Sequence, residues 1–308
     1  MLYLRKGECE MKHRELNART AVIWAVIALL CLTIVSGAQA ADPKLIRFGL
    51  IPADDAAEML RNYEPVKDYL RKVTGIPVEM RVTMDYNAAI EAMRAKHIEM
   101  AWFGPFSYVL ASEFGGAEAI VVGIRRDTGK STYKTVFVTH RDSGIKTIRD
   151  FKGKTIAFVD PASTSGYLIP VSVLKKRGYS IERDFKATFY AGTHNAVELA
   201  VRNRKVDVGA DSDTSYYRMV NAGEIDPKTN VIIHESEPIP GSPIVVRGDL
   251  DPALKKRLQK ALVDMDEQTI FQVKGWGDIA RYEAVTDRHY DSIREVAKIL
   301  NLDLRKSK

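Results

Sequence analysis

Short apolar runs alternate with amphipathic stretches along most of the chain. From residue 45 onward, β-rich runs of a few residues are separated by longer segments in which apolar residues recur at helical spacing. This alternation is typical of βαβ units and predicts an α/β fold with mixed, mostly parallel sheets flanked by helices. The first series predicts strands over 46–51, 77–83, 98–103 and 119–124 and helices over 55–73, 86–96 and 106–114. Pro65 lacks an N–H, so we expect it to break the first of these helices in two.

A second series of similar size follows the first. It predicts strands near 136–139, 155–159, 188–191 and 206–210 and helices near 167–177, 195–202 and 215–221. Strands over 231–234 and 244–247 then flank a turn-rich segment, and after them the pattern predicts only helices, chiefly 252–272 and 291–300.

Two series of this kind predict two lobes rather than one sheet. The helix over 252–272 has an apolar stripe that needs a sheet face, so we expect it to return to the first lobe. The chain would then cross between lobes twice, near 133–139 and 237–244, as a two-strand hinge. The predicted division is a signal peptide over 1–40, the first part of lobe 1 over 41–138, lobe 2 over 139–236, and the return to lobe 1 with C-terminal helices over 237–308.

The N-terminal residues have the pattern of a secretory signal. Basic residues precede an uncharged apolar stretch over 21–35, and Ala38 and Ala40 supply the small-x-small site of signal peptidase. The apolar stretch is shorter than the roughly 20 residues that span a bilayer, so we expect cleavage and export rather than a membrane anchor. The start of translation is either Met1 or Met11.

Composition narrows the possible functions. The 308 residues are 45% hydrophobic and 28% charged, which is ordinary for a globular protein. The formal charge of +6 is mild and not gathered into basic runs, so nucleic acid is not an expected partner. Cys9 and Cys31 both fall in the predicted signal, so the mature chain would have no disulfide, thiol nucleophile or cysteine-ligated metal.

The clearest chemical signal is a row of three hydroxyl residues at a predicted helix start. Ser163, Thr164 and Ser165 follow an apolar strand and precede a helical period. The first backbone N–H groups of a helix have no partner within it, and the helix dipole adds partial positive charge, so this segment could hold an anion. The alternative is that Ser163 or Ser165 is simply a helix N-cap.

Two further strand ends carry polar residues that should lie at the same edge of the second sheet. His194 could donate to an oxyanion, with its charge set by pH, or it could cap the following helix. Asp211 could accept a proton from a protonated oxyanion, or it could be the N-cap of the helix over 215–221.

In the first lobe, aromatic residues at strand ends over 84–87 and 102–105, and Tyr133 at the expected crossing, could form the wall of a cleft or could be ordinary packing. The sequence has no G-x-S-x-G elbow, P-loop, H-E-x-x-H or dinucleotide fingerprint. No His pair has metal-ligand spacing either, so no metal ion or cofactor is expected.

Taken together, these segments resemble the periplasmic phosphonate and phosphite substrate-binding proteins of ABC importers. The resemblance is carried by residues 85–94, 101–108, 160–170, 192–194 and 239–243. It implies a two-lobed periplasmic-binding-protein fold of type II, a periplasmic location, permease transmembrane subunits as partners and no enzymatic activity, and we expect a monomer. In that family the Ser-Thr-Ser turn and the histidine hold the oxyanion from lobe 2, while tyrosines close over it. The matching positions here are Ser163, Thr164, Ser165, His194, Tyr86 and Tyr133.

The resemblance also bears on the ligand. Aminoalkylphosphonate binders of this family place carboxylates for the ligand's amine where this chain has Thr214 and Ser242. A buried ammonium without a partner is unfavourable, so we expect phosphite or a small alkylphosphonate such as methylphosphonate, with a slight preference for phosphite. Two alternatives are a ligand-sensing protein for a membrane kinase and a secreted hydrolase that uses Ser165 and His194.

Overall fold

The structure is a computed structural model that describes residues 42–272 and 278–300. The predicted signal peptide lies outside the described residues, and its cleavage stays a prediction. Among the residues described, no helix combines the length and the apolar character needed to cross a membrane.

The first lobe, called lobe 1, is built on a six-stranded sheet. Its strand order is β13-β4-β12-β3-β1-β2. Strand β1 pairs in parallel with β2 and β3, whereas β12 is antiparallel to β3 and β4, and β13 is antiparallel to β4. The strands are β1 (Ile46–Leu50), β2 (Val78–Val82), β3 (Met100–Trp102), β4 (Ala117–Arg125), β12 (Pro243–Arg247) and β13 (Ile279–Ala284).

The second lobe, called lobe 2, is built on a five-stranded sheet with the order β10-β6-β9-β7-β8. Strand β7 is parallel to β8 and β9, and β6 is antiparallel to β9 and β10. Its strands are β6 (Thr135–His140), β7 (Thr155–Phe158), β8 (Ala187–Tyr190), β9 (Val208–Ser212) and β10 (Asn230–Glu235). Strand β6 includes residues on both sides of the predicted limit at 138/139, yet all of it belongs to this sheet.

A third, two-stranded sheet joins the lobes where the crossings were expected. Strand β5 (Thr132–Tyr133) pairs antiparallel with β11 (Ile239–Pro240). The chain enters lobe 2 directly after β5 and leaves it directly before β11. The α/β fold with two lobes is therefore confirmed, as are the mixed sheets. Parallel pairs are not the majority in either sheet, because β4, β6, β10, β12 and β13 all pair antiparallel.

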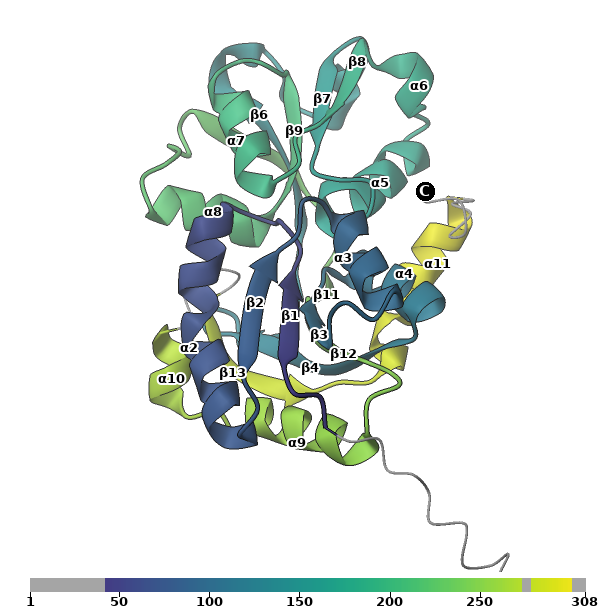
Figure 1. The fold of residues 1–308 in the computed structure, drawn as a ribbon. Helices are drawn as coiled ribbons and strands as arrows, with labels where there is room; N and C mark the ends of the chain where they lie inside the picture. The colour runs from purple at the N-terminus through teal and green to yellow at the C-terminus, as the bar shows by residue number, and fades with distance from the viewer. Residues whose placement is uncertain (1–41, 273–277, 301–308) are drawn as a thin grey trace, which may run out of the picture. The chain divides into compact units, whose positions relative to one another are not determined.

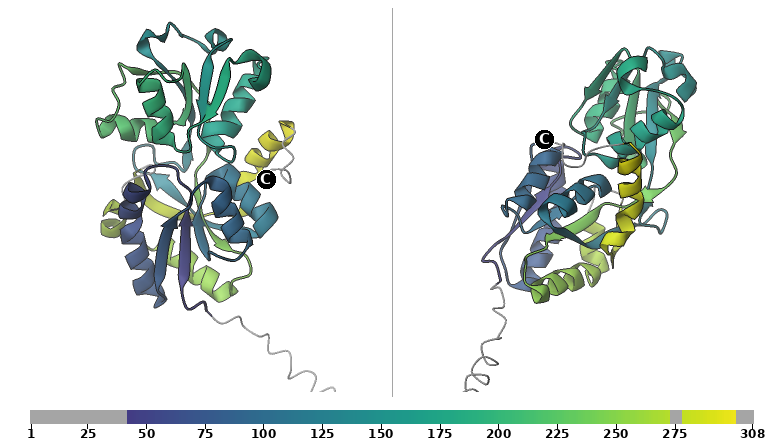
Figure 2. Two further views of the ribbon diagram at one scale, coloured as in Figure 1. Left: turned by 45° about the horizontal axis from the view of Figure 1, so that its top comes forward. Right: turned by 90° about the vertical axis from the view of Figure 1, so that its right-hand side faces the viewer.

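Helices cover the sheets of both lobes (Figures 1 and 2). In lobe 1, α10 packs against α2 and α11 packs against α4; in lobe 2, α7 and α8 pack on β9. The α-helices are α2 (Ala56–Thr74), α3 (Tyr86–Arg94), α4 (Pro105–Gly115), α5 (Ile169–Lys176), α6 (Ile181–Asp184), α7 (His194–Arg202), α8 (Asp213–Asn221), α9 (Pro252–Val263), α10 (Glu267–Gln272) and α11 (Asp291–Ile299). Four further single turns are η1 (Arg141–Ser143), η2 (Ile148–Phe151), η3 (Thr164–Leu168) and η4 (Asp287–Tyr290).

Three expectations about single elements are wrong. Helix α2 runs unbroken through Pro65, because Tyr63, Val66 and Leu70 on its buried face keep it packed on the sheet. The segment 252–272 is two helices rather than one. The segment 279–284 is a strand, β13, and only Ile279 and Tyr282 of it are buried because it lies at the sheet edge. An edge strand buries few residues, so its apolar pattern is weak.

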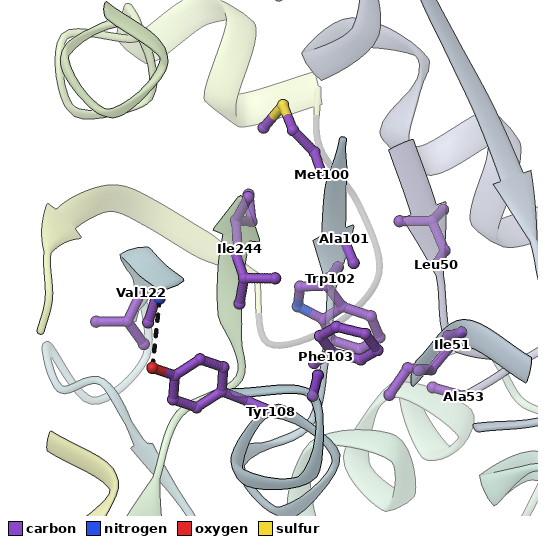
Figure 3. Packing of buried hydrophobic residues seen from close by; sticks show 14 of the residues in the cluster. Leu50, Ile51, Ala53, Met100, Ala101, Trp102, Phe103, Tyr108, Val122 and Ile244 are labelled. Carbon is purple, nitrogen blue, oxygen red and sulfur yellow. Dashed lines mark hydrogen bonds between the residues drawn. The ribbon is translucent and has the colours of Figure 1, made fainter. Parts of the chain in front are cut away.

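The core of lobe 1 brings the site-bearing loops together. Figure 3 shows Leu50 and Ile51 at the end of β1 beside Trp102 and Phe103 at the end of β3. Phe103 is fully buried and Trp102 is almost so. The loops that follow these two strands therefore leave the sheet from one packed edge, and both reach lobe 2, as described next.

Candidate functional site: a candidate anion-binding site

The three hydroxyl residues lie in a single tight turn after β7. Ser163 is the N-cap of η3, a π-helical turn, and its Oγ accepts a hydrogen bond of 3.0 Å from the N–H of Gly166. The N–H of Leu168 bonds to the carbonyl of Ser163, five residues back, at 3.0 Å. Ser163 is therefore a helix N-cap, and its role in anion binding stays a prediction. The wide turn also places Pro170 inside the first turn of α5, where a missing N–H costs little.

Gly166 lets this turn lie against the end of β7. A Cβ at this position would come within 2.3 Å of Val159 Cγ2 and 2.9 Å of Ser163 Oγ. Such distances are shorter than real carbon contacts, so any side chain here would push the hydroxyl turn away from the strand. The glycine thus fixes where the turn sits.

The hydroxyls of this turn are almost fully buried and face lobe 1. Thr164 Oγ1 accepts a hydrogen bond of 2.8 Å from the backbone N–H of Phe106, at the start of α4. The side chain of Tyr86, the first residue of α3, hydrogen bonds with Ser163. Tyr133 hydrogen bonds with Thr164 and Ser165. The structure therefore brings Tyr86, Tyr133 and all three hydroxyl residues together.

His194 lies at the start of α7, beside this turn. The N-cap of α7 is Thr193, whose Oγ1 accepts a hydrogen bond of 3.2 Å from Ala196, so the prediction that His194 could be the cap is wrong. The His194 ring is 2% exposed. Its backbone N–H donates to the carbonyl of Ala53 in lobe 1 at 3.0 Å. The histidine is thus held between the lobes.

Asp211 is the next-to-last residue of β9 in lobe 2, and it contacts the ring of His194. Its Oδ1 is hydrogen bonded to Nδ1 of His194 and accepts the Ser212 N–H at 2.6 Å. Ser212, rather than Asp211, is the N-cap of α8, so the cap alternative for Asp211 is also wrong. Burial raises the pKa of the Asp211 carboxyl to about 8 and lowers the pKa of the His194 imidazole to about 3. The pair therefore carries no net charge at neutral pH.

A small cavity of about 40 Å³ adjoins Tyr133. Thr214 and Ser242 both line it, so the two positions that the resemblance singled out do lie together. Arg125 is the one charged residue among the lining residues, and its Nη1 is paired with Asp213 at 2.8 Å. The lining residues are Trp102, Gly123, Arg125, Ser131, Thr132, Tyr133, Thr214, Gly241, Ser242 and Ile279.

Sequence reasoning missed an ion pair between the lobes. Arg218 in α8 donates to Asp54, in the loop after β1, with Nη2 2.6 Å from Oδ1. Asp54 is 5% exposed, and burial raises the pKa of its carboxyl to about 6. No local pattern marks the pair, because its members are far apart in sequence.

Sequence reasoning also missed Glu198, which lies in α7, accepts a hydrogen bond from Asn230 and interacts with the Asp211 carboxyl. This residue did leave a signal. Glu198 stands on the same helix face as His194, Val197 and Val201, so it is an acid in an apolar stripe. An acid at such a position must be paired or neutral.

Among the described residues, no group of three or more His, Cys, Asp or Glu side chains could hold a metal ion. Two lobes joined by two short strands, with buried hydroxyls and a helix start where the lobes meet, define a solute-binding protein.

Comparisons with known proteins agree with this class. A family model described as "ABC transporter, phosphonate, periplasmic substrate-binding protein" matches residues 48–290. The chain therefore belongs to the family of periplasmic phosphonate substrate-binding proteins of ABC transporters, as its sequence motifs predict. The members are binding proteins, which confirms that the chain is not an enzyme and excludes the hydrolase alternative.

Individual relatives differ in what their names say they bind. The chain is 31% identical over 277 residues to the phosphate-import protein PhnD of Mycolicibacterium smegmatis, covering 83% of this chain and 86% of the relative. It is 27% identical to the phosphonates-binding periplasmic protein of Escherichia coli, covering 92% and 85%. The solved structure of PhnD1 from Prochlorococcus marinus in complex with methylphosphonate has a TM-score of 0.77 at 22% identity, covering 84% of this chain and 99% of that one. The chain is thus a substrate-binding component for import of the phosphonate, phosphite and phosphate class.

Proposed function

We propose that this chain captures phosphite or a small alkylphosphonate such as methylphosphonate in the periplasm and delivers it to the transmembrane subunits of an ABC permease. The observation that carries the proposal is the burial of six polar side chains from both lobes and the hinge, three of them in the turn at the start of η3. Each is at most 6% exposed: Tyr86, Tyr133, Ser163, Thr164, Ser165 and His194.

These side chains suit an anion because they are neutral donors. Hydroxyl, phenol and imidazole N–H groups, together with the positive end of the dipole where the helix begins, surround negative charge without adding a buried cation. These dipoles can stabilise a buried anion without a positively charged side chain. A small group of donors suits a ligand with few oxygen atoms, that is, a small oxyanion. Asp211 is hydrogen bonded to Nδ1 of His194 and so holds the imidazole ring in place.

The cavity beside Tyr133 bears on the substituent of the ligand. It is about 40 Å³ in volume, which is room for a hydrogen or a methyl group. None of the described residues that line it is acidic, so an ammonium placed there would have no carboxylate partner among them. Phosphite and methylphosphonate therefore fit better than 2-aminoethylphosphonate.

Capture would occur by closure of the lobes. The contacts that join lobe 1 to lobe 2 include Phe106 N–H to Thr164, the carbonyl of Ala53 to His194 N–H, and Asp54 to Arg218. Strands β5 and β11 are the natural hinge, because rotation about them leaves both large sheets intact. A ligand that bonds to both lobes shifts the population toward the closed form.

A calorimetric panel of phosphite, methylphosphonate, 2-aminoethylphosphonate, phosphate and sulfate tests the proposal. We expect phosphite and methylphosphonate to bind most tightly, and Ser163→Ala to abolish that binding. Ser180→Ala is the matched control, because Ser180 also precedes a lobe 2 helix, α6, but makes no side-chain cap bond. Tighter binding of 2-aminoethylphosphonate or phosphate, or full binding by Ser163→Ala, would contradict the proposal.

The partner needs a separate experiment. Cross-linking the ligand-bound protein in its own cells should capture permease subunits. Capture of a sensor-kinase ectodomain in their place would support the sensing alternative instead.

A further inference from the structure

Two carboxyl groups lie side by side in lobe 2 with no access to water. Glu198 in α7 and Asp211 in β9 are each 0% exposed. The two carboxyl groups interact directly, and each has a buried oxygen, Glu198 Oε1 or Asp211 Oδ2, that no N–H or O–H group of another residue satisfies. Two carboxylates in contact and without solvent cannot both be ionised, so at least one proton is held between them.

The remaining bonds of this pair identify which oxygens share the proton. Glu198 Oε2 accepts a hydrogen bond of 2.7 Å from Asn230 Nδ2. Asp211 Oδ1 is bonded to His194 Nδ1 and to the Ser212 N–H. The oxygens left over, Glu198 Oε1 and Asp211 Oδ2, are buried and have no N–H or O–H of another residue as donor. A proton on Glu198 Oε1, donated to Asp211 Oδ2, satisfies both.

The surroundings favour a neutral arrangement. The charged and titratable groups that act on the pair are Asp54 from the loop after β1, Arg218 and Tyr216 from α8, and Tyr86 from α3. Arg218 is already paired with Asp54, at 2.5 Å between Nη2 and Oδ2. Among the described residues, Arg218 is the cation that acts on Asp211, and its effect is smaller than that of burial, which raises the pKa of both carboxyls.

Charge neutrality fixes the state of the histidine ring. With Glu198 protonated, one proton lies between Asp211 Oδ1 and His194 Nδ1. Whether that proton is bonded to oxygen or to nitrogen, a pair of zero net charge must carry a second proton on His194 Nε2. The ring then presents an N–H donor on its far side from Asp211.

We propose that Glu198 is a positioning residue of the anion site: by sharing a proton with Asp211 it holds the Asp211 carboxyl against His194 and keeps His194 as an N–H donor at Nε2. The role toward a ligand rests on the proposed function. When the three-residue unit loses one proton at alkaline pH, Asp211 is ionised, Nδ1 keeps its hydrogen and Nε2 becomes an acceptor. The unit then carries a negative charge next to the anion site.

Nitrogen-15 NMR of the imidazole groups in ligand-free protein tests the positioning role directly. The His194 signal is assigned by its loss in His194→Gln. We expect Nε2 to carry hydrogen at pH 7, and the hydrogen to move to Nδ1 near the pKa of about 8 that burial gives Asp211. A bare Nε2 at pH 7 in the native chain would overturn the proposal without any variant.

Variants then separate proton sharing from packing. We call the movement of the His194 hydrogen from Nε2 to Nδ1 the switch. Glu198→Gln keeps an N–H donor to Asp211 Oδ2, so the pH of the switch should stay within about one unit of its value in the native chain. Glu198→Leu fills a similar volume without a donor, so ionised Asp211 loses a bond and the switch should move upward by a unit or more. An unchanged switch in both variants would mean that Glu198 is only a packing residue.

Ligand affinity is measured on the same samples with methylphosphonate, corrected for the ligand's own ionisation. We expect a fall of about tenfold or more across the switch, because a donor is lost and a like charge appears. If the NMR spectra show the predicted switch but methylphosphonate does not bind, the proposed function is contradicted and the positioning role of Glu198 is still supported. Binding that does not change across the switch would contradict the role of His194 as donor.

Discussion

Arg218 of lobe 2 and Asp54 of lobe 1 form an ion pair in which both side chains are largely buried, at 14% and 5% exposed. Arg218 has two further carboxylates nearby, Glu58 at 3.6 Å and Glu224 at 3.5 Å, and both are partly exposed. Within the described part of the chain Asp54 pairs with Arg218 alone, so the desolvation of Asp54 is offset less than that of Arg218.

The first prediction concerns Asp54→Asn. Burial raises the pKa of Asp54 from 3.8 to about 6, so the folded chain binds this proton more tightly than the unfolded chain. The stabilisation from the proton is present below pH 4 and is lost as the pH rises through 6. We expect Asp54→Asn to be more stable than the native chain at pH 7, by at most about 3 kcal/mol, and equal to it near pH 4. Urea unfolding at the two pH values measures the difference.

Removing the other member of the ion pair should have the opposite effect. Arg218→Gln leaves Asp54 buried and ionised, which we expect to cost roughly 3 kcal/mol at pH 7 and less at pH 5. Adding Asp54→Asn should restore stability. Glu58→Gln is the control, since it contacts the same guanidinium from a more exposed position. Equal losses in Asp54→Asn and Arg218→Gln would contradict the reasoning.

A third prediction concerns the bond between Thr164 and the N–H of Phe106. Thr164→Val keeps the shape of the side chain but leaves that buried N–H without an acceptor whenever the lobes meet, at a cost of about 1–3 kcal/mol. Affinity for the preferred ligand should fall by roughly ten- to a hundredfold. Thr164→Ser retains the oxygen and should stay within a few-fold of the native chain in calorimetry. If Val and Ser variants behave alike, the cross-lobe bond has no role in binding.

A fourth prediction concerns the fit of α7 on β9. A Cβ at Gly209 would come within 2.7 Å of Val197 Cγ1 and 2.8 Å of Val201 Cγ2. Gly209→Ala should therefore lift the helix that carries His194, lowering stability by about 1–3 kcal/mol and weakening anion binding. Val201→Ala in the same chain makes room and should recover part of both losses. Thermal unfolding measures the stability, and calorimetry the anion affinity, of the single and double variants.

A fifth prediction concerns the cavity beside Tyr133. Ser242→Asp places a carboxylate in its lining, so affinity for 2-aminoethylphosphonate should rise relative to methylphosphonate by tenfold or more. Ser242→Asn has the same size without the charge and should not change the ratio. A ratio that is the same in both variants would show that the ligand's substituent does not enter this cavity.

The sequence predicts what depends on local pattern. The row Ser163, Thr164 and Ser165 is visible because a helix N-cap needs only one hydroxyl residue and here three follow one another. The two series of alternating strands and helices predict two lobes. The π-helical geometry of that turn is not predictable, because a bond between residues five apart leaves no periodicity in the sequence.

Contacts that depend on packing were out of reach. The pairing of Asp54 with Arg218 arises only when distant parts of the chain meet. His194 and Asp211 were expected at the same edge of the second sheet, but their direct contact was not predicted. Glu198 was within reach, because an acid beside Val197 and Val201 contradicts the apolar stripe of its helix. Strand β13 was missed because an edge strand buries few of its residues.

The adjacent position of β5 and β11 has a consequence for engineering and evolution. Because these strands pair, the whole intervening segment starts and finishes at neighbouring points, as an inserted domain does. Such a block can be exchanged between homologous chains by two cuts only. Chimeras that carry lobe 2 of a relative would then show whether ligand preference is determined by the residues of lobe 2 or by those of lobe 1.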